Sequence, residues 1–184
     1  MCLCGFVFAA TPGVWLDVPF IRQEKDGCGA ASIAMVMQYW AKQQNVHQQN
    51  LNQKNNAADK DADPVEIQRS LYSSKDRDSS KDRGIRAVYL ERYFQQHGFQ
   101  TLTFSGKWDD LKQHIEKGRP LIVALKPSAL EAQLHYVVVV GVDPAENIVY
   151  LNDAAQRKLL KQERANFEKQ WSATREWTLL ALPK

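Results

Sequence analysis

One stretch of the sequence combines a candidate nucleophile with the start of a helix. Cys28 lies between two glycines, and after it apolar residues recur at helical spacing from Ile33 to Trp40. This periodicity predicts a helix over about 29–41, with Cys28 at or just before its first turn. Free backbone N–H groups and the positive end of the helix dipole favour a thiolate there. Cys28 is therefore a candidate nucleophile, while burial as a packing residue is the alternative.

A histidine precedes an apolar run later in the chain. His135 is followed by a tyrosine and four valines, a pattern that predicts a strand over 135–142. The polar turn after it predicts a hairpin with a second strand over 148–152. His135 therefore lies at the mouth of a hairpin. Taken alone, it would be interpreted as a capped or partly buried structural histidine.

The register of that hairpin supplies a partner for the histidine. If Val142 pairs with Ile148, Asp153 lies opposite Val137 and on the same face of the sheet as His135. The two side chains are then diagonal neighbours with Cα atoms about 7–8 Å apart. In this register Asp153 accepts a hydrogen bond from one ring nitrogen while the other nitrogen faces a nucleophile. Taken alone, Asp153 would be interpreted as a turn residue.

A side-chain amide precedes the cysteine and completes the candidate site. Gln23 can donate to an oxyanion together with the backbone N–H of Cys28, or it can be an ordinary exposed glutamine. The other histidines fit this chemistry less well. His47 lies in a polar stretch, and His97 and His114 lie on predicted helices as surface or packing residues.

Composition limits the classes of function. The chain has 184 residues, of which 24% are charged, and its net charge is only +3. A chain of this length forms one domain with a substantial core, here expected over 15–184. The basic residues are scattered and no glycine-rich phosphate loop is present, so we expect no nucleic-acid partner. Cys28 and His135 lack the further ligands of a zinc site, so we expect no metal and no cofactor.

The first residues are interpreted as a signal segment. Cys2 and Cys4 lie in an apolar opening that resembles the h-region of a signal peptide, here assigned to residues 1–14. The opening lacks a basic n-region, which suggests a truncated start; a lipoprotein signal and an N-terminal strand are the alternatives. Its removal would leave Cys28 as the sole cysteine. A location outside the cytoplasm is therefore expected.

A polar insertion separates the cysteine from the rest of the predicted core. The insertion spans about 42–84, and its residues 42–60 are rich in Gln, Asn, Lys and Asp, which indicates a solvated or disordered loop. Asp63 and Pro64 then have the features of a helix start, and Val65, Ile67 and Leu71 give that short helix some apolar surface. The S-S-K-D-R motif follows and occurs twice over 73–84. We interpret that duplication as slippage in a surface loop rather than as a structural repeat.

Periodicity predicts the remaining elements and the fold class. Helices come early, strands come late, and the strands are connected closely enough for antiparallel pairing, which favours an α+β fold. The further elements are an extended segment over 15–21, helices over 86–97, over 109–117 and around Phe167 and Trp171, and strands over 99–104, 121–126 and 176–182.

These residues together resemble a known family. The helix start from Gln23 through Cys28-Gly29-Ala30-Ala31, the strand Leu134-His135-Tyr136-Val137-Val138-Val139 and the corner Asn152-Asp153-Ala154-Ala155 carry the resemblance. It is to the bacteriocin-processing, double-glycine leader peptidases. These are papain-like cysteine peptidases that are fused to ABC exporters or exported as stand-alone proteins. The resemblance extends from about Trp15 to the C-terminus, and the helix at Phe167 and Trp171 resembles the stand-alone branch.

The resemblance implies a papain-like fold, with the cysteine-bearing helix packed on an antiparallel sheet that carries the histidine. It implies roles for Cys28 as nucleophile, His135 as general acid and base, Asp153 as orienting residue and Gln23 as oxyanion donor. The implied partners are a peptide or protein substrate and a separate chain of an export system. The chain departs from the exporter-fused members by its polar insertion and its lack of transporter spans, so double-glycine specificity does not follow.

Two other functions are consistent with the same residues. The acyl-thioester chemistry of a cysteine peptidase also serves acyl or peptidyl transfer to an amine, with identical site residues. A peptide-binding module of an export system, without turnover, is the other alternative. The intact cysteine, histidine and aspartate favour an enzyme.

Overall fold

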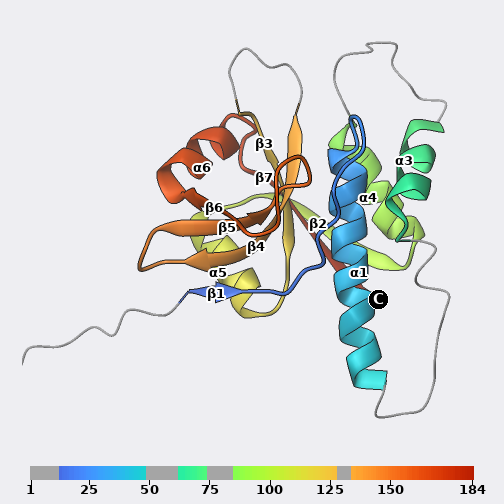
Figure 1. Ribbon diagram of the computed structural model, residues 1–184, viewed down its shortest axis with the longest axis horizontal. Helices are drawn as coiled ribbons and strands as arrows, with labels where there is room; N and C mark the ends of the chain where they lie inside the picture. Colours follow the sequence, from blue (N-terminus) through green and yellow to red (C-terminus); the bar gives the residue numbers. More distant parts are fainter. Residues whose placement is uncertain (1–12, 49–61, 74–84, 128–133) are drawn as a thin grey trace, which may run out of the picture.

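The structure is a computed structural model, and it describes residues 13–48, 62–73, 85–127 and 134–184 (Figure 1). Most of the predicted signal segment and of the duplicated S-S-K-D-R stretch therefore lie outside the described residues. The elements in chain order are β1 (Val14–Trp15), α1 (Cys28–Gln48), α3 (Pro64–Ser73), α4 (Ala87–Gln96), β2 (Phe99–Ser105), α5 (Trp108–Glu116), β3 (Leu121–Leu125), β4 (His135–Asp143), β5 (Ile148–Asn152), β6 (Leu160–Glu163), α6 (Arg164–Ser172) and β7 (Trp177–Pro183).

The strands form one antiparallel sheet, which confirms the predicted α+β class. Its order is β2-β7-β3-β4-β5-β6, and β1 pairs with β4. β3 lies inside the sheet between β7 and β4, as its continuous apolar sequence predicts. The sequence did not predict β6, and it predicted only an extended segment at β1. These strands have four and two residues, too few to show an alternating pattern.

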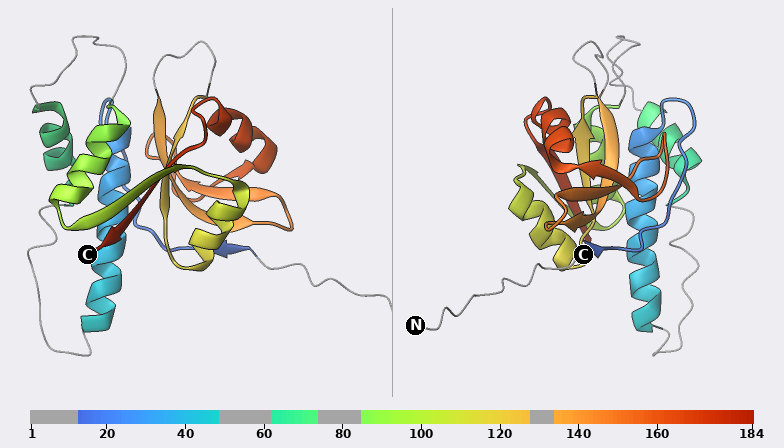
Figure 2. Two further views of the ribbon diagram at one scale, coloured as in Figure 1. Left: turned by 180° about the vertical axis from the view of Figure 1, so that it is seen from behind. Right: turned by 60° about the vertical axis from the view of Figure 1, so that its left-hand side comes forward.

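Both faces of the sheet are covered by helices. Tyr136 and Val138 of β4 pack in the cluster formed with α1, α3 and α4, whereas Val137 and Val139 pack in the cluster formed with α5 and α6. Figures 1 and 2 show the same division, with α1, α3 and α4 on one side of the sheet and α5 and α6 on the other. The cysteine-bearing helix is therefore packed on the sheet that carries the histidine, as predicted.

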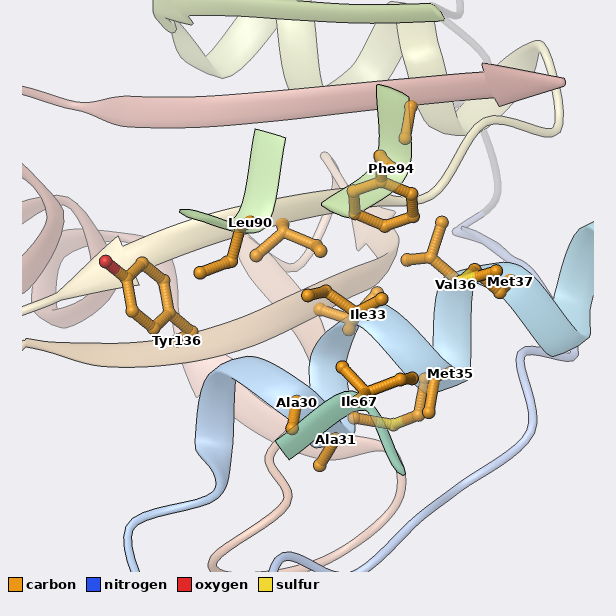
Figure 3. Close-up of a cluster of buried hydrophobic side chains, with 14 of the residues drawn as sticks. Ala30, Ala31, Ile33, Met35, Val36, Met37, Ile67, Leu90, Phe94 and Tyr136 are labelled. Carbon is orange, nitrogen blue, oxygen red and sulfur yellow. The ribbon is translucent and has the colours of Figure 1, made fainter. Parts of the chain in front are cut away.

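α1 is anchored in the core by its first half. Ile33, Ala34 and Met35 are fully buried, and Figure 3 shows Ile33 and Met35 among side chains from the neighbouring elements. The helix extends to Gln48, beyond the predicted end at residue 41. The prediction of a loop from residue 42 was wrong here, because only the apolar stripe ends there. The Gln, Lys and Asn residues that follow are compatible with a helix.

The polar insertion also contains α3, a helix that docks on α1. α3 begins at Pro64 as predicted, and the Asp63 carboxylate caps it by accepting the N–H of Val65 at 2.8 Å. Ile67 and Leu71 are buried in the same cluster as α1. The helix predicted at this place in the insertion is therefore confirmed, and its apolar side chains belong to the core.

The β4–β5 hairpin differs from the predicted register at its turn. Asp143 pairs with Ile148 and Val142 with Val149, whereas the prediction paired Val142 with Ile148. The Asp143 carboxylate accepts two backbone N–H groups of the turn, each at 3.1 Å. These bonds close a loop that is one residue shorter than predicted.

A β-bulge just before Gly141 restores the predicted register further along the hairpin. On the far side of the bulge Val138 pairs with Asn152. Continuing that register places Val137 opposite Asp153, as the sequence analysis expected. Two departures from the predicted pairing, one in the turn and one in the bulge, thus cancel before the strands reach His135.

Candidate active site

Cys28 is the first residue of α1, at the position where the sequence analysis expected a nucleophile. The N–H of Ala31 donates to the carbonyl of Gly27 at 2.9 Å as the helix begins. The Cys28 side chain is buried, and it is the free cysteine within the described ranges. A thiol in this place lies beside the unpaired N–H groups of the first helical turn.

His135 is the first residue of β4, and Asp153 follows the last residue of β5. Their side chains hydrogen-bond, with 2.9 Å between Nε2 of His135 and Oδ1 of Asp153. Cys28 lies close enough to the same imidazole to raise the pKa of His135. Because Nε2 is engaged by the carboxylate, Nδ1 is the ring nitrogen that remains for the thiol. The structure therefore brings thiol, imidazole and carboxylate into one row.

The neighbours of His135 favour the charged form of its imidazole. Burial by itself lowers the pKa of His135, but its hydrogen bonds to Asp153 and Cys28 and the negative charges of those two groups raise that pKa to about 10. The ring is thus held as an imidazolium near neutral pH. A cation in that place is the partner that a thiolate requires.

Asp153 is itself held in place by several donors. The N–H of Ala155 donates to Oδ1 at 2.9 Å, and Nε2 of Gln156 donates to Oδ2 at 2.6 Å. Burial raises the pKa of Asp153, but the hydrogen bond and charge of His135, together with these two donors, lower it on balance. The sequence analysis did not identify Gln156, because an exposed glutamine in a turn carries no distinguishing pattern.

Gln23 lies in the loop before α1, next to the corner that carries Asp153. Its backbone N–H donates to the carbonyl of Ala154 at 3.0 Å. The side-chain Oε1 of Gln23 is buried and has no hydrogen-bond partner among the described residues. Gln23 is thus tied to the aspartate corner through its backbone, while its amide oxygen is left unpaired.

Asn152 is a positioning residue to which the sequence analysis gave no role beyond the end of a predicted strand and the corner that carries the resemblance. Its side chain is fully buried and donates to the carbonyl of Val18 at 3.1 Å, and it accepts the N–H of Leu159 at 3.1 Å. It therefore joins the loop that leads to Cys28 with the loop that holds Asp153. The signal in the sequence that could have indicated this role was an asparagine at the end of a predicted strand, directly before a candidate acid.

A tyrosine forms the buried surroundings of the thiol. Tyr136 is fully buried, and its hydroxyl donates to the carbonyl of Ile85 at 2.9 Å. Burial, and then the charge of Cys28, raise the pKa of Tyr136. A β-carbon at Gly29 would lie 3.6 Å from the Tyr136 ring. The glycine after Cys28 thus lies against this apolar wall.

His97 and His114 make packing contacts away from this site. Nδ1 of His97 lies 2.7 Å from the carbonyl of Tyr93, and the two rings stack. His114 lies 6.0 Å from the Phe104 ring, measured between centroids. Within the described ranges no cluster of metal-ligating side chains occurs, and no helix has the length and apolar character to cross a bilayer.

A family model matches nearly the whole chain. The family is described as the Peptidase_C39 like family, and its model matches residues 15–178. No curated protein sequence matches the chain.

Solved structures share the fold at low sequence identity. A protein described as a C39-like peptidase from Bacillus anthracis has a TM-score of 0.68 and 16% identity, over 95% of this chain and 99% of that one. The peptidase domain of Streptococcus ComA, a bi-functional ABC transporter involved in quorum sensing, has a TM-score of 0.60 and 16% identity, over 90% of this chain and 98% of that one. A double glycine motif protease from an AMS/PCAT transporter, in complex with the leader peptide, has a TM-score of 0.60 and 20% identity, over 95% and 99%.

Proposed function

Because the chain belongs to the Peptidase_C39 like family, we propose that it is a cysteine peptidase that cleaves peptide bonds at Cys28. The observation that carries the proposal is the row of side chains around His135. The imidazole is hydrogen-bonded to Asp153 at 2.9 Å through Nε2, and Asp153 and Cys28 together raise its pKa to about 10 against the opposite effect of burial. A thiolate paired with a retained imidazolium is suited to nucleophilic attack on a carbonyl carbon.

Each residue has a defined part in the proposed reaction. The Cys28 sulfur attacks the peptide carbonyl, and His135 gives its Nδ1 proton to the leaving amine. Water, deprotonated by the now neutral imidazole, then hydrolyses the thioester, which releases the acid product and restores the thiolate and the imidazolium. Asp153 holds the ring orientation through Nε2 and stabilises the imidazolium.

The oxyanion of the tetrahedral intermediate needs donors. We assign this role to the backbone N–H of Cys28 and the side-chain amide of Gln23. The contact of Gln23 with Ala154, 3.0 Å from N–H to carbonyl, supports this by tying the amide-bearing residue to the aspartate corner.

For the substrate we propose leader or secreted peptides, met outside the cytoplasm. The fold is shared with the peptidase domain of an ABC transporter and with a double glycine motif protease that holds a leader peptide. The apolar opening of the sequence supports export. Fractionation of cells, with N-terminal sequencing of the protein recovered, tests the location and the removal of residues 1–14.

The activity is tested with the wild-type protein and the Cys28→Ala variant. Both are incubated with a peptide library and the products are identified by mass spectrometry. We expect cleavage by the wild type alone. In parallel, iodoacetamide labelling is quantified for each cysteine, and we expect Cys28 in the folded protein to react faster at neutral pH than Cys2 and Cys4.

The outcomes separate the alternatives. Equal labelling of Cys28 in native and heat-unfolded protein, with no cleavage, would contradict a peptidase. Products that carry an added amine acceptor would indicate acyl transfer. Peptide binding that is unchanged in Cys28→Ala, without cleavage, would indicate a binding module.

A further inference from the structure

The chain makes a tight turn between the proposed oxyanion donor Gln23 and Cys28. Within this turn the N–H of Gly27 donates to the carbonyl of Glu24 at 3.0 Å, and Asp26 has a φ of 58°. A left-handed conformation is less stable for aspartate than ordinary backbone conformations. The nucleophile turn, residues 24–27, therefore needs contacts from outside itself to keep one conformation.

Gln68 supplies such contacts from α3. Its Nε2 donates to the carbonyl of Lys25 at 3.0 Å, and that carbonyl belongs to the central peptide of the turn. Its Oε1 faces Gly27 so closely that a β-carbon there would lie 3.0 Å away. Gln68, Gly27 and Gln23 also line one small pocket of about 80 Å³. Gln68, a side chain of the polar insertion, thus contacts both Lys25 and Gly27 of the turn.

The position of Gln68 is fixed by the way α3 docks. Ile67, the preceding residue, is fully buried, and Figure 3 shows it beside Ala31 and Met35 of α1. Nε2 of Gln38 in α1 donates to the carbonyl of Ala62, just before α3, at 3.2 Å. Because α3 is packed on the helix that begins with Cys28, the backbone of Gln68 is held in a fixed place relative to that helix.

We propose that Gln68 is a positioning residue for the reaction and that α3 acts as a buttress of the nucleophile turn. The inference rests on the proposed function, and it assigns a function to α3, which is part of the polar insertion. By holding the Lys25 carbonyl, Gln68 fixes the peptide planes that lead to the Cys28 N–H and the direction from which Gln23 approaches. Donors of an oxyanion site lose effect when they are displaced by a fraction of an ångström.

Two reagents separate the oxyanion site from the thiol. Acetylation by p-nitrophenyl acetate passes through a tetrahedral oxyanion, whereas alkylation by iodoacetamide does not. The rate of each reaction at Cys28 is measured by mass spectrometry for the wild type, Gln68→Ala and Gln68→Glu. We expect both variants to lower the acetylation rate about tenfold and to change the alkylation rate less than about twofold. Gln68→Glu keeps the size of the side chain but removes the N–H donor.

Arg69→Ala is the matched control. Arg69 is the next residue of α3, is exposed, and pairs with Glu66 of the same helix. We expect it to leave both rates unchanged. Equal losses in both reactions for Gln68→Ala, or wild-type rates in Gln68→Glu, would overturn the proposal.

Hydrogen exchange tests whether Gln68 holds the turn without relying on the reactivity of Cys28. We expect exchange over residues 23–29 to be faster in both Gln68 variants and unchanged in Arg69→Ala. Unchanged exchange in the Gln68 variants would overturn the proposal. A wild-type protein whose Cys28 reacts with neither reagent would contradict the proposed function, while the exchange comparison would still decide whether Gln68 holds the turn.

Discussion

The chemistry of the candidate site depends on one imidazole between two acidic groups. His135 hydrogen-bonds to Asp153 through Nε2, and Asp153 and Cys28 raise its pKa to about 10 against the opposite effect of burial. The proton that this ring holds is the one that the leaving amine needs. The alkaline end of the activity profile should therefore report the state of His135.

We predict that Asp153→Asn moves the alkaline limb of activity to lower pH. Loss of the carboxylate removes the largest of the effects that raise the pKa of His135, so the ring loses its proton earlier. At neutral pH we expect kcat/KM to fall roughly 10- to 100-fold. The measurement is peptide cleavage between about pH 5 and about pH 11. A limb that stays at the wild-type pH would contradict the assigned pairing.

Gln156→Leu gives a graded comparison for that experiment. It removes the donor to Asp153 Oδ2 but keeps the carboxylate charge. The alkaline limb should therefore move less than in Asp153→Asn.

We predict that Asn152→Ala destabilises the protein by about 2–3 kcal/mol. The change leaves the partly buried N–H of Leu159 and the buried carbonyl of Val18 without their side-chain partner. Urea unfolding measures the loss. Asn166→Ala, an exposed change on α6, should cost less than about 0.5 kcal/mol. Equal effects of the two substitutions would show that the Asn152 bonds add nothing.

At the scale of elements, the site depends on how residues 14–16 pair with β4. β1 pairs with β4 at Val14–Val142 and Trp15–Gly141, and the N–H of Leu16 donates to the carbonyl of Val140 at 2.7 Å. This pairing occurs at the bulge that corrects the hairpin register. The chain then continues toward Gln23 and α1.

We predict that Gly141→Ala separates β1 from β4. Its β-carbon would lie 2.7 Å from Cβ of Trp15 and 2.8 Å from the carbonyl oxygen of Val14, so β1 must move. The cost should be about 1–3 kcal/mol, with faster hydrogen exchange at Leu16. Gly98→Ala is the control, because it has open space around it and its strain comes from a φ of 82°. Loss of Leu16 protection in the control as well would contradict a local effect.

The sequence predicts elements where a repeating pattern exists. The helices at Leu90 and Ile115 and the buried strand at Val123 follow from apolar periodicity, and the α3 start follows from Asp63 and Pro64. The short strands, the bulge and the polar end of α1 do not, because tertiary partners determine them.

The same distinction holds for the candidate site. Cys28 and His135 lie in local patterns, and Asp153 follows from strand parity, so all three were candidates before the structure. Gln68 was not, because its contact with Lys25 depends on where α3 docks. No pattern within the insertion indicates that contact.

At the scale of the whole molecule, stability should reflect the buried ion pair. His135 has a raised pKa, so its contribution is complete below about pH 6.5 and is lost as the pH rises toward 10. Asp153 has a lowered pKa, so its contribution is complete above its ordinary value of 3.8 and is lost in acid. The two contributions overlap fully in mildly acidic solution.

We therefore predict a stability maximum in mildly acidic solution. Urea midpoints measured across the pH range should fall on both sides of it, and Asp153→Asn should flatten both slopes. Midpoints that rise steadily from neutral pH to about pH 10 would contradict the ion pair.

The position of β7 has a consequence for synthesis. This strand, residues 177–183, lies between β2 and β3, which come much earlier in the chain. Until the ribosome has added those residues, the sheet lacks the strand between β2 and β3. The hairpin that carries His135 is then part of an incomplete sheet. We therefore expect Cys28 and His135 to reach their folded arrangement only after residue 183 has been translated and has left the ribosome.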